Sequence, residues 1–382
     1  MKKFLVTIFY ISILLFSRQN NAQAQESSRL RISLLTCAPG DELYSIFGHS
    51  AIRITDSIRG TDYVYNYGTF NFDDDFYVKF MKGKLLYYVS VDEFENFAYN
   101  YQMMQRGITE QVLDLSKEEA ESIQRALLEN SKEENKYYKY DFFLDNCTTR
   151  IRDIISKFKK TQLPTQHVMP AKTRFREAIH TYLDRGGQQW SKLGIDILLG
   201  APTDKVMTAN EQQFLPDNLM SALDMNEKSI IIKEKKVLFQ FDKKNESAFF
   251  SSPAFLFSMF LVLISLLSFS KNKIILNSLN IFDRILYGTT GLLGIILLLM
   301  WFATDHSMTK NNFNLLWAVP SHILLSFGLN SKKTFIKKYL FYTALLSGLT
   351  LISWFFLPQT LNAALIPVVL LILIRSLKNQ SS

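Results

Sequence analysis

The 382-residue sequence has few of the residues from which common catalytic and structural sites are built. Its two cysteines, Cys37 and Cys147, are too few for a disulfide framework and allow one bridge at most. No Cys-x-x-Cys or His-x-x-x-His pair gathers ligands at zinc spacing. Gly-rich phosphate loops and the Gly-x-Ser-x-Gly elbow are also missing. We therefore expect neither a metal nor a cofactor.

The charge distribution argues against nucleic acid as a partner. The formal net charge is +8, from 43 Lys and Arg against 35 Asp and Glu. A basic balance of this kind is often a sign of nucleic-acid or anionic-surface binding. Here, however, much of the excess lies in short loops between apolar runs, and no interleaved basic-aromatic motif occurs. Membrane topology explains this excess better than nucleic-acid binding does.

Composition divides the chain into three parts. Lys2 and Lys3 precede an apolar run at residues 4–16, and Ala22-Gln23-Ala24 gives a small-x-small cleavage site. This pattern predicts a signal peptide at 1–24, with an uncleaved anchor as the weaker alternative. Residues 25–248 are mixed and charged, as in an exported globular domain. Apolar runs dominate from 249 to 382 and predict a membrane domain.

The membrane domain contains five apolar segments, at residues 251–270, 285–303, 313–329, 339–356 and 361–374. Pro320 and Pro367 interrupt the third and the fifth, so four spans remain an alternative to five. Lys and Arg gather in alternate loops and in the C-terminal tail, which predicts that these are cytoplasmic. The exported domain then lies in the periplasm of a multi-pass protein of the bacterial inner membrane.

The exported domain shows patterns of both strands and helices, which makes the fold class α+β. Strand patterns occur at 30–36, at 137–143 and in a hairpin of 50–54 and 63–67, and a strand pair is expected within 229–241. Ser116-Lys117-Glu118-Glu119 is a capping box that opens a helix to about residue 131. Further helices are expected at 173–184, 191–199 and 210–223.

A candidate nucleophile lies where the 137–143 strand gives way to another helix. Cys147 is predicted at that helix N-terminus, where unpaired N–H groups favour a thiolate. His49 begins one hairpin arm and is the candidate base. Asn66 on the other arm is the candidate orienting group, with Tyr65 as its competitor. The alternative for the cysteines is a Cys37–Cys147 disulfide.

The remaining histidines carry weaker signals. His167 and His180 are predicted to be surface residues. His322 lies inside an apolar span and is either a packed polar contact or a functional group, the latter being the usual default for an ionisable residue there. The outer loop at 304–317 is unusually polar and contains His306, Asn312 and Trp317. We interpret it as a capped, solvated loop; the alternative is that it contacts the substrate or the catalytic groups.

Several motifs resemble a known family. The segments are Phe47-Gly48-His49-Ser50-Ala51-Ile52-Arg53, Tyr65-Asn66-Tyr67-Gly68-Thr69-Phe70, the 140–150 run with Asp145-Asn146-Cys147-Thr148-Thr149, and Gly194-Ile195-Asp196-Ile197-Leu198-Leu199-Gly200. The order of His before Asn-Cys is similar to the circularly permuted branch of the NlpC/P60 papain-like fold. More closely, the segments and the overall layout resemble the DUF4105 domain and the Lnb-type lipoprotein N-acyltransferases of the Bacteroides type.

The resemblance implies a papain-like domain followed by about five spans, and a ping-pong acyl transfer through a thioester on Cys147. The donor would be a membrane phospholipid, and the acceptor the α-amine of a diacylglyceryl-cysteine apolipoprotein. Residues expected near the site or its substrates are Tyr65, Asn146, Arg53, Arg150, His306, Asn312 and Trp317. Two other functions remain open: a membrane-tethered cysteine hydrolase, either peptidase or phospholipase, and a non-catalytic envelope protein with a disulfide.

Overall fold

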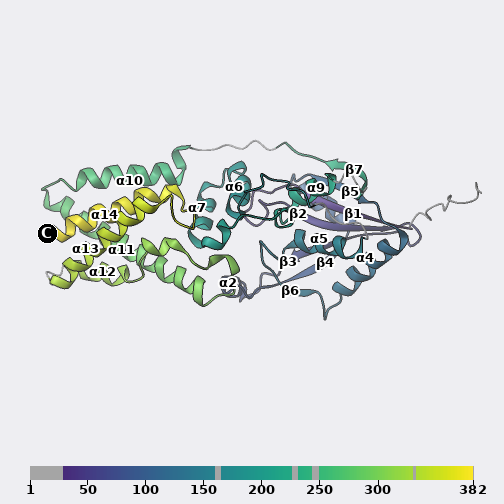
Figure 1. Ribbon diagram of the computed structural model, residues 1–382, viewed down its shortest axis with the longest axis horizontal. Helices are drawn as coiled ribbons and strands as arrows, with labels where there is room; N and C mark the ends of the chain where they lie inside the picture. The colour runs from purple at the N-terminus through teal and green to yellow at the C-terminus, as the bar shows by residue number, and fades with distance from the viewer. Residues whose placement is uncertain (1–28, 160–164, 226–230, 243–248, 330–332, 382) are drawn as a thin grey trace, which may run out of the picture.

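The computed structural model describes residues 29–159, 165–225, 231–242, 249–329 and 333–381. A sheet-containing domain occupies one end of the elongated molecule, and a bundle of apolar helices occupies the other (Figure 1). This arrangement confirms an α+β domain followed by a helical membrane domain. The expected signal peptide, residues 1–24, lies outside the described residues.

The sheet has seven strands in the order β6-β4-β3-β2-β1-β5-β7, and all neighbouring pairs are antiparallel. The strands are β1 (Leu30–Cys37), β2 (His49–Asp56), β3 (Thr61–Thr69), β4 (Leu86–Glu93), β5 (Ile108–Leu113), β6 (Tyr137–Lys139) and β7 (Ile232–Phe239). The hairpin expected from residues 50–54 and 63–67 is β2–β3. Its apolar and β-branched residues face helices on both sides, so these central strands are largely buried.

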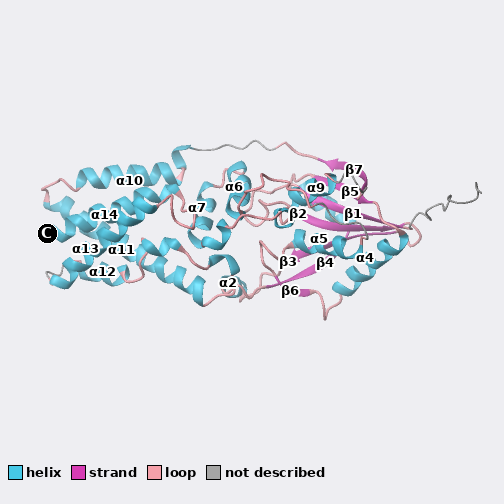
Figure 2. Ribbon diagram, viewed as in Figure 1, coloured by secondary structure: helices cyan, strands magenta, loops and turns pink. Residues whose placement is uncertain are grey.

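Helices cover the two faces of the sheet unequally (Figure 2). The larger core packs β1, β2 and β3 against α4 (Lys117–Asn130), α5 (Cys147–Phe158) and α9 (Pro216–Asp224). The opposite face carries α3 (Phe94–Met103), whose Phe97 packs on Ala51 and Val64. Since side chains alternate along a strand, neighbouring residues of β2 belong to different cores.

Two strand predictions require correction. The strand expected over 137–143 ends at Lys139, because the chain leaves the sheet for a corner closed by the Asp141–Asp145 bridge. The strand pair expected within 229–241 is one strand, β7, which pairs with β5. The polar residues Glu234 and Lys235, at which two strands would have to be joined, both take part in the ladder to β5, so long-range pairing overrides the local polarity.

Between the sheet and the bundle lie α6 (Phe175–Arg185) and α7 (Gln189–Leu198), followed by η1 (Ala201–Asp204) and α8 (Ala209–Gln212). The short helix α2 (Phe76–Met81) also lies at this junction (Figure 1). The helix expected over 210–223 is split into α8 and α9, because Pro216 starts a new helix at its first position.

The membrane domain consists of α10 (Pro253–Leu267), α11 (Lys273–Phe302), α12 (His322–Gly328), α13 (Thr334–Ser353) and α14 (Ile366–Ser381), with short 3₁₀ turns at 307–309, 313–316 and 363–365. Within the described residues, three helices are long and apolar enough to span a membrane, namely those at 273–302, 334–353 and 363–380. The count of five is therefore not confirmed by helix length.

Two of the expected spans have a different length from the prediction, and in each of them a proline accounts for the difference. The 313–329 segment is broken, since Pro320 separates the turn at 313–316 from α12. The fifth segment is longer than expected, because Pro367 lies in the first turn of α14, where a missing N–H costs little. The first segment is α10, an apolar helix shorter than a full span.

Two loops of the bundle hold the sheet domain. Ser307 Oγ donates to Asp141 Oδ2 at 2.6 Å, and Asn362 Nδ2 donates to Asp196 Oδ2 at 2.8 Å. At Gly200 the backbones approach so closely that an added Cβ would lie 1.8 Å from the carbonyl oxygen of Lys310. The glycine closing the Gly194–Gly200 motif is therefore required by this contact between the two domains.

Candidate active site

Cys147 is the first residue of α5, and Asn146 is the N-cap that fixes it there. Asn146 Oδ1 accepts from the backbone N–H groups of Thr148 and Thr149, at 2.8 and 2.9 Å. Its Nδ2 donates to the carbonyls of Phe142 and Phe214. All the hydrogen-bonding capacity of this buried amide is thus used to hold the corner. Asn146 positions the thiol rather than facing a substrate.

His49 reaches the thiol from the first position of β2. Gly48 precedes it with φ +78°, and a Cβ there would lie 2.8 Å from the Cys37 carbonyl oxygen. Only glycine permits this turn into the strand without strain. His49 Nε2 lies 3.3 Å from Asn66 Oδ1. Because Nε2 faces Asn66, Nδ1 is the ring nitrogen that remains for the interaction of His49 with Cys147.

The environment of Cys147 favours the thiolate. Burial of the sulfur raises the pKa of the thiol. The charge of His49 lowers this pKa, as do hydrogen bonds from the His49 side chain, the Ser50 backbone and the Thr148 hydroxyl, and together they outweigh the effect of burial. The net result is a pKa of about 7, below the ordinary value of 9.0. A thiol with this pKa is partly ionised at neutral pH and, being only half-buried, is accessible to a reactant.

A further carboxylate supports the histidine and was not identified from sequence. Asn66 Nδ2 donates to Asp92 Oδ2 at 2.8 Å, which fixes the amide with its oxygen toward His49. Asp92 lies on β4, and Ser90 of the same strand donates to it at 3.4 Å. No local signal marks Asp92, because it joins the group only through the pairing of β3 with β4.

The second cysteine is a separate, unreactive group. Both thiols are free, so the structure contains no Cys37–Cys147 disulfide. Cys37 pairs with His49 across the β1–β2 ladder but is fully buried in the α3 core. Burial raises the pKa of its thiol to about 12, and a hydrogen bond with Tyr101 offsets only part of this rise.

Three of the other expected residues belong to the fold around the site. Tyr65 is buried on the α5 face, opposite to Asn66, so it does not compete for His49. Arg53 pairs with Asp62 at 2.6 Å and with Glu110 at 3.2 Å. Arg150 forms a double hydrogen bond with Asp145 and lies over the Tyr138 ring. Both arginines are thus engaged in ion pairs.

The three expected residues of the outer loop lie at the domain junction. His306 Nε2 donates to the Phe80 carbonyl at 3.0 Å. Asn312 is buried and donates to the carbonyls of Ile197 and Leu198, and buried Trp317 donates to Asn314. None of these bonds is to Cys147 or His49. The loop does reach the Cys147 corner, but through Ser307 and Asp141.

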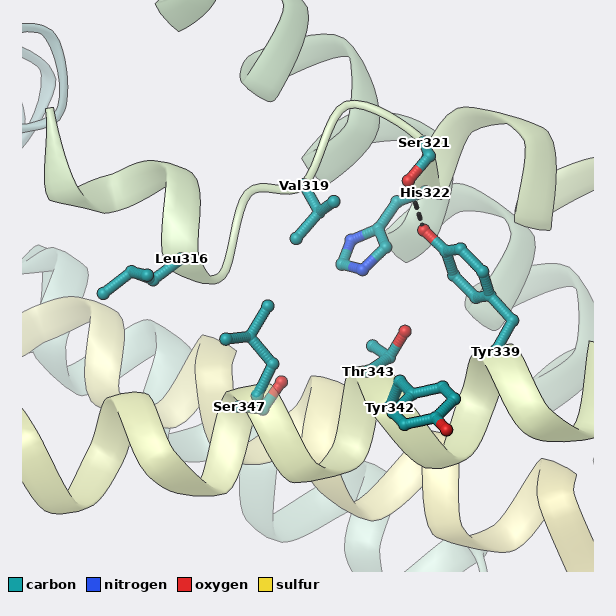
Figure 3. Close-up of a pocket in the computed structure, with 9 residues that line it drawn as sticks. Leu316, Val319, Ser321, His322, Tyr339, Tyr342, Thr343 and Ser347 are labelled. Atoms are coloured by element: carbon teal, nitrogen blue, oxygen red, sulfur yellow. Dashed lines mark hydrogen bonds between the residues drawn. The ribbon is translucent and has the colours of Figure 1, made fainter.

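His322 lies in a separate cavity of the membrane domain, between α12 and α13 (Figure 3). The cavity has a volume of about 150 Å³, and its lining includes Ser321, Tyr339 and Ser347. His322 Nδ1 lies 3.3 Å from Thr290 Oγ1, while Nε2 has no hydrogen-bond partner. No lining residue comes from the sheet domain, so this cavity is distinct from the Cys147 site.

His180 is not the surface residue that was expected. It contacts Asp196 Oδ1 at 2.8 Å within the junction, as Arg176 Nη1 does. Among the described residues, no group of three or more His, Cys, Asp and Glu side chains is arranged to hold a metal ion. The groups that the structure brings together around Cys147 are a thiol, an imidazole, an amide and a carboxylate.

Comparison with known proteins gives two matches, both to domains of one family. Residues 18–176 match the model of the Lnb N-terminal periplasmic domain, and residues 244–381 match that of the Lnb transmembrane domain. The chain belongs to the Lnb family. No curated protein and no solved structure matches it.

Membership of the Lnb family assigns the sheet-containing half to the periplasm and the helical bundle to the membrane. It indicates a membrane enzyme of lipoprotein processing, with lipid and lipoprotein partners. Cys147, His49, Asn66 and Asp92 all fall within the residues matched by the Lnb periplasmic domain.

Proposed function

We propose that this protein is a lipoprotein N-acyltransferase, which moves an acyl chain from a membrane phospholipid to the α-amine of a diacylglyceryl-cysteine apolipoprotein. The observation that carries the proposal is the Cys147 thiol, with a pKa of about 7 beside His49, in an Lnb-family chain. A thioester suits this task because it reacts readily with amines when water is excluded. Cys147, His49 and Asn66 are the proposed catalytic residues.

In the first half-reaction, Cys147 Sγ attacks an ester carbonyl of the phospholipid. The C–S bond forms, the ester C–O bond breaks, and protonated His49 gives its proton to the departing lysophospholipid oxygen. The oxyanion formed on the way requires N–H donors. The backbone N–H of Cys147, at the start of α5, is our candidate donor.

In the second half-reaction, the α-amine of the apolipoprotein attacks the thioester. The C–N bond forms and the C–S bond breaks, while neutral His49 accepts a proton from the amine. The free thiolate and the imidazolium are thereby restored for the next cycle. Asn66 accepts from His49 Nε2–H in both steps and keeps Nδ1 directed at the sulfur.

Both proposed substrates carry acyl chains in the bilayer, so the membrane domain would keep the active site at the level of the bilayer. Ser307 hydrogen-bonds the corner that carries Cys147, so the site is held against the outer side of the bundle. We propose a signal peptide at 1–24, a permuted papain-like domain at 25–248, and a multi-pass domain at 249–382 with a cytoplasmic C-terminus. Alternating Lys-rich loops support this orientation.

The test is mass spectrometry of lipoprotein N-terminal peptides from cells with the gene, without it, and complemented with Cys147→Ala. We expect the amide-linked acyl chain only with the wild-type gene. A hydroxylamine-labile acyl group on Cys147, trapped when acceptor is withheld, would support the thioester step. Lipoproteins that keep the same number of acyl chains without the gene would contradict the proposal, and release of free fatty acid would favour a hydrolase.

A further inference from the structure

A continuous series of aromatic rings runs from the domain junction to Cys147. We define this aromatic track as Phe72, Phe76, Phe80, Phe70, Tyr87 and Tyr140. Its residues come from α2, from the segment before α2, from β4 and from the corner before α5. The track takes no part in the helix cap, the His49–Asn66 pair or the contacts of Arg150.

Each ring of the track contacts the next one. The Phe76 and Phe80 centroids are 6.0 Å apart, and the Phe72 and Phe76 centroids are 4.5 Å apart. Phe70 lies 5.1 Å from Phe72 and 5.3 Å from Tyr87. Tyr87 stacks on Tyr140 at 4.2 Å. The rings are thus in continuous contact with one another over this length.

The inner end of the track lies beside the nucleophile. Gly68 has φ +91°, and a Cβ added to it would lie 3.6 Å from Cys147 Cβ and 3.6 Å from the Tyr140 ring. Tyr140 and Cys147 therefore flank the same glycine. Because Gly68 has no side chain, no side chain from this position lies between the Tyr140 ring and Cys147.

The outer end of the track lies at the membrane domain. The carbonyls of Phe80 and Lys82 accept hydrogen bonds from His306 Nε2 and from the Asp305 backbone, at 3.0 Å each. Asp305 follows the end of the candidate span α11, at Phe302, by only three residues. The α2 segment is therefore held at the level where α11 leaves the apolar part of the bilayer.

Several apolar side chains in and before α2 are exposed, although Phe76 is buried. Phe72 is 72% exposed, Phe80 50% and Met81 59%. Lys82 and Lys84 are exposed beside Phe80 and Met81, whereas the exposed residues next to Phe72 are Asp73, Asp74 and Asp75. Large exposed apolar side chains with adjacent lysines are typical of segments that lie in the interface of an anionic bilayer. Anchorage to α11 makes the bilayer the surface that covers them.

We propose that the aromatic track binds an acyl chain of the donor phospholipid and guides its ester carbonyl from the bilayer to Cys147. This inference rests on the proposed acyltransferase function and adds the route of the donor. The exposed end at Phe72, Phe80 and Met81 receives lipid, Lys82 and Lys84 attract its phosphate, and Tyr87 and Tyr140 lead the chain to the thiol.

The test uses the full-length protein in nanodiscs of phosphatidylethanolamine and phosphatidylglycerol, with a phospholipid that carries a diazirine in its acyl chain. Thioester formation on Cys147 is followed by intact mass in the wild type and in Phe72→Ser/Phe80→Ser. We expect at least a tenfold slower reaction in this variant. The matched control is Ile58→Ser, which removes an apolar side chain 73% exposed in the turn after β2; its rate should equal the wild type.

Two further readouts separate the track from the chemistry. Alkylation of Cys147 by iodoacetamide should be equal in all three proteins, which shows that the site is folded. Photo-crosslinking in Cys147→Ala should label peptides from residues 70–87 without any turnover. If these crosslinks form but the wild type makes no thioester, the track stands and the acyltransferase function fails.

Two results would overturn the track itself. One is a wild-type thioester rate in Phe72→Ser/Phe80→Ser; if this variant also loses transfer to a diacylglyceryl lipopeptide, the track belongs to the acceptor instead. The other is crosslinking confined to α10–α14.

Discussion

His49 and His180 occupy two polar clusters that contain similar side chains and differ in how completely those side chains are paired. His180 contacts the Asp196 carboxylate at 2.8 Å, and Arg176 and Asn362 donate to the same carboxylate at 2.8 Å each. Asp196 and Arg176 are almost fully buried. Burial raises the pKa of the Asp196 carboxyl, but His180 and Arg176 more than offset this and keep it below its usual value.

His49 instead faces the neutral amide of Asn66 at the longer distance of 3.3 Å, and its other partner is the half-buried Cys147. A fully paired buried network fixes one structure, and at the junction it locks α6 and α7 to the membrane helices. A thiol with a shifted pKa and an open side is a group prepared to react. Both clusters contain a histidine, so the comparison indicates that the incompletely paired thiol beside His49 separates the reactive cluster from the docking one.

Removing the nucleophile should have the largest effect. We expect Cys147→Ala to lower thioester formation and acyl transfer by at least about 10³-fold, because no other described thiol is accessible. The Tm should stay close to the wild type, since Asn146 still caps α5. Cys37→Ala is the matched control and should keep most of its activity. An equally inactive, folded Cys37→Ala protein would argue strongly against Cys147 as the nucleophile.

Breaking the junction cluster should affect stability rather than chemistry. Asp196→Ala removes the carboxylate partner of His180 and one of the two buried carboxylates that pair with Arg176, leaving only Asp204. We therefore expect a loss of about 3 kcal/mol, measured as a lower Tm of the protein in nanodiscs. The rate of Cys147 alkylation at pH 7 should change less than about threefold, because the Asp196 contacts do not include the thiol. Asp184→Ala is the control, since its exposed pair with Lys192 contributes about 1 kcal/mol at most. An unchanged Tm in Asp196→Ala would show that the cluster is dispensable.

Sequence reasoning located the parts of the site that depend on neighbouring residues in the chain. The cap at Asn146 and the helix after it are local, so the place of Cys147 was predictable. The β2–β3 hairpin is also local, and its pairing places Asn66 beside His49, as the sequence predicts. Face alternation along β3 then separates Asn66 from Tyr65, although the sequence alone left both open.

The remaining contacts join distant segments, and nothing in their local sequence marks them. Asp92 reaches Asn66 through the β3–β4 register, and Ser307 reaches Asp141 across the domain junction. The Gly194–Gly200 motif was recognised, but its docking role depends on a loop more than a hundred residues later. His180 was misassigned for the same reason, because its partner Asp196 belongs to the next helix.

The smallest expected effect concerns how pH controls the thiol. With a pKa of about 7, alkylation of Cys147 should rise about tenfold per pH unit below pH 7 and level off above it, because only the thiolate reacts. His49→Gln removes the charge that lowers this pKa and leaves the burial that raises it. We therefore expect the midpoint to move up by at least one unit, and alkylation at pH 7 to slow by at least about fivefold. The measurement is done in Cys37→Ala, which removes the second thiol. An unchanged midpoint in His49→Gln would mean that the helix N-terminus, not the imidazole, sets the reactivity of Cys147, and would leave His49 with no part in activating it.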